Sequence, residues 1–192
     1  MSQSSTEPEG RKAGEPTYRR ELHTDAYDIR VYEPFLVAEV LVEGTAESAS
    51  SEGFRLLAAY IFGANGGSLK LAMTAPVTQT AVKLPMTAPV TQSRDAGGFR
   101  VRFVMPAGYT LNTLPAPNDS RVTLREVSEQ RVAVLRYSGR WTEANYAERV
   151  AALRASLAAD GLTPHGEPVL ARYNAPYVPA FLRRNEVWMA LA

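Results

Sequence analysis

The sequence contains few side chains that can ligate a metal or act as a nucleophile. It has no cysteine and two histidines, His23 and His165. Without cysteine there is no disulfide, thiolate metal site or cysteine nucleophile, and two histidines nearly exclude a site built on several imidazoles. Acidic residues such as Asp28, Glu33 and Glu39 are scattered and form no convincing acid–base pair. These counts argue against metalloprotease and histidine-rich oxidase chemistry and leave apolar and aromatic surfaces as the main candidates for binding.

The composition is that of an ordinary folded domain. Of the 192 residues, 45% are hydrophobic and 21% are charged, which suits one medium domain. Twenty-one basic residues against 20 acidic ones leave a net charge of +1, so no broad basic surface for nucleic acid is expected. No run approaches the ~20 consecutive apolar residues of a membrane span.

The first 16 residues are polar, contain proline and glycine, and have no apolar stretch typical of a secretory signal. We expect residues 1–16 to be a mobile tail and residues 17–192 to be a single folded domain. A cytoplasmic location is the default expectation. An export segment that had been removed would leave no trace in the sequence.

The first half of the chain has strand patterns followed by a helix pattern. The region from Tyr18 is strand-like, with alternation over 27–32 and an apolar run over 35–42. A helix is predicted over about 46–62, with Thr45 as N-cap and Gly63 as its stop. Two further strands are expected in the 73–92 region and over 99–105.

The second half repeats this order. Strands are predicted over 122–126 and 132–135, followed by a helix over about 143–159 that is capped by Thr142 and stopped by Gly161. Strands over 167–173 and 186–191 complete the chain. Two strand–strand–helix–strand–strand halves indicate a pseudo-repeat in an α+β fold, with one sheet or barrel covered by two helices.

A short tandem repeat lies between the halves. The segment 70–79, Lys-Leu-Ala-Met-Thr-Ala-Pro-Val-Thr-Gln, recurs thirteen residues later with Pro85 in place of Ala72. The proline in each copy predicts that neither copy is an interior strand with a complete hydrogen-bond ladder. The repeat either lengthens a strand-and-loop region or supplies two equivalent binding elements.

Several ordered blocks resemble the SOUL haem-binding protein family. They are Tyr60–Asn65, Lys70–Val77, Arg102–Pro106, Leu114–Asn118 and Phe181–Trp188, and together they span about residues 18–192. The resemblance implies a distorted β-barrel, antiparallel or mixed, of two pseudo-symmetric halves flanked by two helices. It also implies binding of haem or a related porphyrin in a surface hydrophobic cleft near the first helix.

A tetrapyrrole cleft needs apolar area on both sides of the ring and cations at its rim. The first helix has two apolar stripes, one of which must face the sheet while the other can remain open to a ligand. The segment 173–182, apolar and aromatic with two prolines, is rigid enough to form a wall, or else it covers the barrel end. The candidate cofactor-binding residues are Phe54, Arg55, Leu57, Ala58, Ile61, Lys70, Met73, Tyr173, Tyr177, Phe181 and Arg183.

An iron ligand is harder to assign. His23 is the candidate metal ligand, with a partly exposed strand histidine as the alternative interpretation. His165 is expected in the loop after the second helix, where a cation near a helix C-terminus is favourable. Met73 and Tyr173 can bind iron in principle, although a strand methionine more often fills a core.

Three functions are compatible with these patterns. The favoured one is non-catalytic binding of a tetrapyrrole as a carrier, buffer or sensor. The second is an enzyme that degrades haem or removes its metal, for which the sequence offers no convincing catalytic pair. The third is a partner-binding or ligand-sensing module resembling the effector-binding domains of bacterial regulators, for which a buried acid facing the cleft would favour small cationic ligands.

Overall fold

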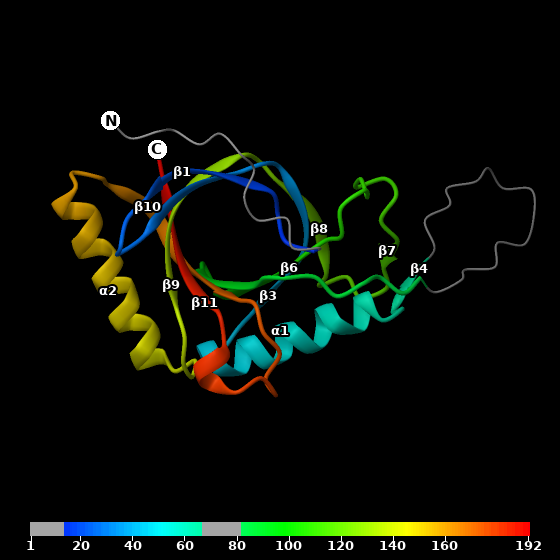
Figure 1. The fold of residues 1–192 in the computed structure, drawn as a ribbon. Helices are drawn as coiled ribbons and strands as arrows, with labels where there is room; N and C mark the ends of the chain where they lie inside the picture. Colours follow the sequence, from blue (N-terminus) through cyan, green and yellow to red (C-terminus); the bar gives the residue numbers. More distant parts are fainter. Residues whose placement is uncertain (1–13, 67–81) are drawn as a thin grey trace, which may run out of the picture.

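The structure, a computed structural model, describes residues 14–66 and 82–192. Two helices and eleven strands make up the described chain (Figure 1). The helices are α1 (Ala46–Ile61) and α2 (Glu143–Ala159), and η1 (Ala180–Leu182) is a 3-10 turn. The strands are β1 (Tyr18–His23), β2 (Asp28–Tyr32), β3 (Phe35–Val42), β4 (Asn65–Gly66), β5 (Val90–Asp95), β6 (Gly98–Val104), β7 (Ala116–Pro117), β8 (Thr123–Val127), β9 (Gln130–Tyr137), β10 (Pro164–Arg172) and β11 (Asn185–Leu191).

Nine of these strands form one curled sheet in the order β1-β2-β9-β11-β10-β5-β6-β3-β8. Every neighbouring pair in it is antiparallel. Figure 1 shows the sheet curving around a central space, with both helices on its outer side. This is the α+β distorted barrel that the sequence predicts.

The two halves are related by a pseudo-twofold axis between β5 and β10. Outward from that axis, β10, β11, β9 and β2 mirror β5, β6, β3 and β8. The first strand of each half therefore pairs with the second strand of the other half: β2 pairs with β9, and β8 pairs with β3. This exchange joins the halves into a single sheet, so that neither half is complete alone.

Strand alternation separates an outer from an inner face of the sheet. In β3, Leu36, Ala38 and Val40 pack with α1 in one hydrophobic cluster, while Glu39 lies on the opposite face. A second outer cluster packs α2 against β9, β10 and β11, and a third cluster, with Tyr32 and Trp188, fills the inner face.

The helix ends confirm the local sequence signals. The hydroxyl of Thr45 accepts a hydrogen bond from the Ser48 backbone N–H, and the Ser48 hydroxyl accepts one from the Thr45 backbone N–H, which completes a capping box. Thr142 caps α2 through the Asn145 N–H. Neither described helix is long and apolar enough to cross a bilayer.

Two expectations change in detail, and a third falls on residues that the structure does not describe. His165 lies in β10, paired with Ala190, rather than in a loop. The second copy of the repeat enters an interior strand directly after Pro89, because Val90 begins β5 between β10 and β6. The first copy lies outside the described residues.

The assignment of residues 1–16 to a tail covers two different parts. Residues 1–13 lie outside the described residues. Within residues 14–16, the carboxylate of Glu15 forms an ion pair with Arg184 at 3.0 Å. The Gly14 carbonyl accepts a hydrogen bond from the Ala88 N–H, so this short stretch contacts the folded domain.

Candidate functional site

The helix α1 packs tightly against the sheet. Leu57 and Ile61 have no exposed surface, and Leu56 and Tyr60 of the other apolar stripe are also buried. A Cβ on Gly53 would lie 2.6 Å from Val101, so glycine allows α1 to approach β6 closely. These buried residues of both stripes belong to the core, whereas Phe54 and Ala58 of the first stripe remain partly accessible.

Of the other candidates on α1, Arg55 lines a second pocket of about 490 Å³, together with Leu56, Ala59 and Tyr60 of the helix and residues 118–122. Phe54 is 40% exposed and makes an edge contact with Phe103, with ring centroids 5.3 Å apart. Ala58 is half-buried, and Arg55 pairs with Glu52 at 2.6 Å. Lys70 and Met73 lie outside the described residues.

The aromatic loop before β11 is rigid and exposed. Tyr177 is 89% exposed and Phe181 is 75% exposed. The Arg183 guanidinium donates to the carbonyl oxygens of Pro176 and Val178, which holds the loop in shape. These residues do not line the large groove described below.

The candidate ligand His23 is exposed at the end of β1. Its Nδ1 lies 2.7 Å from the Asp28 carboxylate, which accounts for its orientation. Neither His23 nor His165 lines the large groove. Within the described residues, no three His, Cys, Asp or Glu side chains gather as a metal site.

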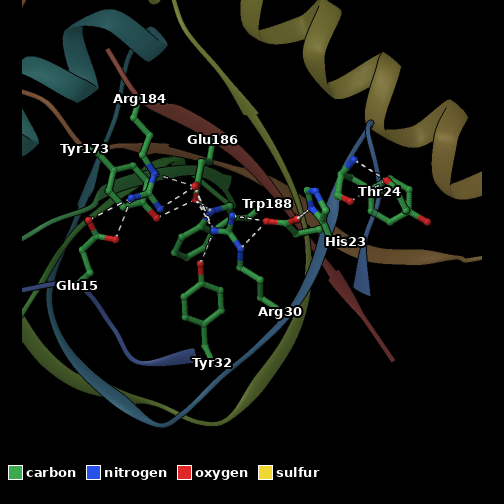
Figure 2. Close-up of polar contacts among 11 residues, drawn as sticks. Glu15, His23, Thr24, Arg30, Tyr32, Tyr173, Arg184, Glu186 and Trp188 are labelled. Atoms are coloured by element: carbon green, nitrogen blue, oxygen red, sulfur yellow. Dashed lines mark hydrogen bonds and ion pairs between the residues drawn. The ribbon is translucent and has the colours of Figure 1, made fainter. Parts of the chain in front are cut away.

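The inner face of the sheet holds a buried ionic cluster around Glu186 (Figure 2). This carboxylate has no exposed surface and accepts hydrogen bonds from Arg30, Arg184, Tyr173 and Trp188 at 2.8–3.2 Å. Burial disfavours its charged form, but the attraction of Arg30 and Arg184 outweighs burial and lowers the pKa of Glu186.

The position of Tyr173 follows from this cluster. Its hydroxyl donates to Glu186 at 2.8 Å, and burial beside that carboxylate raises its pKa well above 10. A neutral phenol in this position is a poor iron ligand, since tyrosine binds iron as the phenolate. Tyr173 therefore contributes to the barrel interior.

A large groove of about 600 Å³ lies on the outer side of the sheet, between α2, β5 and β10. Its lining is mostly apolar and aromatic, with Phe99, Trp141, Tyr146, Val150 and Leu170. The volume falls within the ~300–1,000 Å³ typical of small-molecule sites. The sequence placed a ligand at the other helix and missed this groove.

The groove forms because α2 contacts the sheet mainly through its C-terminal half. Leu153 and Leu157 are its buried residues, whereas Tyr146 and Val150 on the same face are only half-buried. The short side chains of Ala147 and Ala151 leave space above the strands. Since Tyr146 donates its hydroxyl to the Pro168 carbonyl at 3.0 Å, the helix is held in this position.

The groove combines an uncharged apolar surface with a few charged side chains of both signs. Arg94 and Arg154 line it together with Glu143 and Glu167, so the charged lining residues balance. Burial raises the pKa of Tyr146 to about 12, which keeps its hydroxyl neutral. The described lining contains no histidine, cysteine or methionine, so its fit is to a flat apolar ring and not to an iron ligand.

The fold is a pseudo-symmetric barrel with a large apolar groove on the outer side of its sheet. The family profile of the SOUL heme-binding proteins matches residues 13–190. The chain therefore belongs to the SOUL haem-binding protein family.

Two relatives have haem-binding names. Heme-binding protein 2 of Homo sapiens is 31% identical over 167 residues, covering 85% of this chain and 77% of the relative. Heme-binding protein 1 of Sus scrofa is 26% identical over 172 residues, covering 87% and 85%. Among solved structures, the EcmrR C-terminal domain superposes with a TM-score of 0.59 at 10% identity, covering 91% of this chain and 98% of that one. A hydrolase from Listeria innocua gives 0.59 at 12% identity, covering 90% and 94%; both likenesses show the fold alone.

Proposed function

We propose that the protein binds haem without chemical conversion, as a carrier or buffer, with the macrocycle in the groove between α2, β5 and β10. The observation that carries this proposal is an open, apolar groove of about 600 Å³ in a member of a haem-binding family. A few hundred Å² of buried ring, at ~25 cal/mol per Å², stabilises a complex by several kcal/mol before the costs of association.

The residues around the groove support binding through the ring. Trp141, Tyr146 and Phe99 supply aromatic surface, while Val150 and Leu170 supply aliphatic surface. Because the described lining has no iron ligand, we expect metal-free protoporphyrin to bind with an affinity similar to that of haemin. The same lining offers no imidazole as a general base, which favours carriage over catalysis.

The buried ionic cluster around Glu186 gives little support to the ligand-sensing alternative. A buried acid is present, since Glu186 is fully inaccessible. Its charge is compensated by Arg30 and Arg184, and it lies on the inner face of the sheet, away from the groove. A small cation would have to displace two guanidinium groups to reach this carboxylate, so a cationic ligand is disfavoured.

The first test is a haemin titration followed by Soret absorbance and tryptophan fluorescence. Trp141 lines the groove and Trp188 is buried beside Glu186, so a Trp141→Phe variant leaves an internal reference. We expect saturable Soret changes, with most of the fluorescence quenching lost in Trp141→Phe. Absence of any saturable change in the wild type would reject haem binding.

A matched pair of variants tests the location. Ala151 and Ala152 are both exposed on α2, but only Ala151 lines the groove. Ala151→Trp is expected to weaken haemin binding at least tenfold, and Ala152→Trp is expected to leave it unchanged. Because the two substitutions are chemically identical, a difference between them reports occupation of the groove.

The second candidate location is the surface implied by the family resemblance, on α1 and the aromatic loop. Its accessible described residues are Phe54, Arg55, Ala58, Tyr177, Phe181 and Arg183. If Phe54→Ser combined with Phe181→Ser abolishes haemin binding while Ala151→Trp does not, the macrocycle lies on this surface. His23→Ala and His165→Ala are expected to leave the absorption spectrum of the complex unchanged in either case.

A further inference from the structure

Four buried side-chain polar atoms have no hydrogen-bond partner among the described residues. They are Gln92 Oε1, Tyr137 OH, Trp141 Nε1 and Arg172 Nε. A buried polar group without a partner is costly, and in a native protein it calls for a physical explanation. The four residues come from three strands and one loop, so their position in space decides whether they have a common cause.

Two of these residues, Gln92 and Trp141, line the groove, and Arg172 and Tyr137 adjoin Trp141. The Arg172 guanidinium carbon is 5.1 Å from the centre of the Trp141 ring, and Gln92 and Trp141 both line the groove. Gln92 pairs with Leu170 of β10, two residues before Arg172. Tyr137 is close enough to Arg172 for each to affect the pKa of the other.

Arg172 is unusual among the arginines at the sheet. It is half-buried and donates to the Ser50 hydroxyl at 2.5 Å, but within the described chain it forms no ion pair with a carboxylate. Removal from water lowers the pKa of Arg172, which is the signature of a desolvated cation without compensation. Arg30, by contrast, pairs with both Asp28 and Glu186. Leaving a desolvated charge uncompensated costs stability.

The chemistry of the unpaired atoms is that of an anion site. Arg172, Trp141 and Tyr137 each have an unused N–H or O–H donor, and Arg172 adds a positive charge. A carboxylate accepts several such bonds and is stabilised most by a guanidinium. The amide of Gln92 is fixed by a 2.8 Å bond from its Nε2 to the Ala46 carbonyl. Its unpaired Oε1 can therefore accept a bond from an N–H group or a water bound with the ligand.

The geometry points to a carboxylate-recognition subsite where Trp141 and Gln92 border the groove, completed by the adjoining Arg172 and Tyr137. The inference rests on the proposed function and adds to it the orientation of the ligand. Haem has two carboxylates on one edge. Arg94 and Arg154 at the mouth are balanced by Glu143 and Glu167, whereas Arg172 is unopposed. The acidic edge of the macrocycle therefore enters first, and its opposite edge faces solvent.

The first experiment compares haemin with its dimethyl ester, which has the same ring and no free carboxylate. One charge-assisted hydrogen-bond set corresponds to about a 10- to 100-fold difference in affinity, with haemin binding more tightly. Equal affinities would overturn the carboxylate subsite and leave haem binding itself intact. Failure of both ligands to bind would reject the proposed function instead.

A pair of arginine variants distinguishes recognition from support of the fold. Arg172→Met keeps the length of the side chain and removes its charge, and Arg136→Met makes the same change at an exposed arginine of β9 that does not line the groove. We expect Arg172→Met to weaken haemin binding at least tenfold, to leave the ester unaffected, and to keep or raise the thermal midpoint, because it removes an uncompensated charge. Arg136→Met is expected to change haemin affinity less than about threefold.

A lower thermal midpoint in Arg172→Met with an unchanged ratio of haemin to ester affinity would show a structural role and overturn the inference. If Arg172→Met does not fold, Trp141→Phe provides the second measurement, since it keeps an aromatic ring and removes one donor. Its ratio of haemin to ester affinity is expected to fall. An unchanged ratio in Trp141→Phe would also count against the subsite.

Discussion

The two halves of the barrel have the same order of elements but seat their helices differently. In the first half, α1 buries residues along its whole length, and Gly53 brings it against β6. In the second half, α2 buries Leu153 and Leu157 only, and its N-terminal half stands away from β10. The comparison teaches that a groove opens in the half whose helix buries fewer residues, and this groove is the ligand site that we propose.

The inner face of the sheet gives a second comparison between the halves. Each half buries one glutamate there: Glu39 beside Arg100 and Arg102, and Glu186 beside Arg30 and Arg184. Arginines of the same chain form ion pairs with both carboxylates, so both buried negative charges are compensated. Arg172, which contacts Trp141 of the groove lining, has no such carboxylate partner in the described chain, and this contrast supports the proposed ligand site outside the sheet.

The largest expected effect concerns the interior of the second half. Glu186→Gln leaves Arg30 and Arg184 without their shared carboxylate and is expected to lower the free energy of unfolding by about 3–5 kcal/mol at pH 7. Glu39→Gln is expected to cost less, because Arg100 and Arg102 are partly exposed. Urea unfolding of both variants measures the difference, and equal losses would contradict it.

The stability difference between Glu186→Gln and the wild type is expected to depend on pH. The pKa of Glu186 is lower in the folded protein than its ordinary value of 4.5, so its contribution is fully present above that value. It is lost as the pH falls through the lowered folded value. The stability gap between wild type and Glu186→Gln should therefore be constant from neutral pH down to about pH 4.5 and shrink as the pH falls further. A gap that widens in acid would reverse the sign of the proposed electrostatics.

The next prediction compares the helices directly. Leu57→Ala in α1 opens a cavity in a fully buried site and is expected to cost about 3 kcal/mol. Val150→Ala in α2 removes a half-buried groove residue and is expected to cost less than about 1 kcal/mol. Denaturant midpoints at unchanged slope give both values. Similar losses would mean that α2 packs in solution as tightly as α1.

The close contact of α1 with β6 gives a smaller effect. In Gly53→Ala the added methyl meets Val101, and the strain is expected to exceed the ~1 kcal/mol that alanine gains in a helix. A net loss of about 1 kcal/mol in the free energy of unfolding is expected. The control is Ser51→Ala on the exposed side of the same helix. A stabilised Gly53→Ala would show that α1 can move away from the sheet.

The smallest effect concerns the start of α2. Thr142→Ala removes the side-chain acceptor of the Asn145 N–H and is expected to cost about 1 kcal/mol or less. Because the first half of α2 stands over the groove, we expect faster amide hydrogen exchange confined to its first turns. Uniformly faster exchange along the whole helix would indicate that α2 forms a single cooperative unit with the sheet.

Sequence reasoning located the elements because their signals are local. The caps Thr45 and Thr142 and the stops Gly63 and Gly161 set both helices within a residue or so of their observed ends. Alternation over 27–32 identified β2, an apolar run over 35–42 identified β3, and the order of the elements predicted two related halves. The exchange of β2 and β8 between the halves was not predictable, since it depends on pairing across more than eighty residues.

The site was harder to predict than the fold. Two apolar stripes on α1 suggested one face for the core and one for a ligand, but the curved sheet and the loop that carries Pro115 bury both Leu57 and Tyr60. The groove at α2 had a weak signal in Ala147 and Ala151 beside Tyr146. Small residues on a helix face indicate either close packing or open space, and the sequence does not distinguish these.

By itself the sequence determined the periodicities, the caps and the family blocks, because each depends on residues near one another in the chain. Only the tertiary structure decided which helix stands away from the sheet and which charges are compensated. Compensation requires two groups from distant segments to meet, as Arg30 meets Glu186 across 156 residues, and Arg172 meets no such carboxylate in the described chain. That difference is a property of packing, and it directs the proposed ligand to the outer groove.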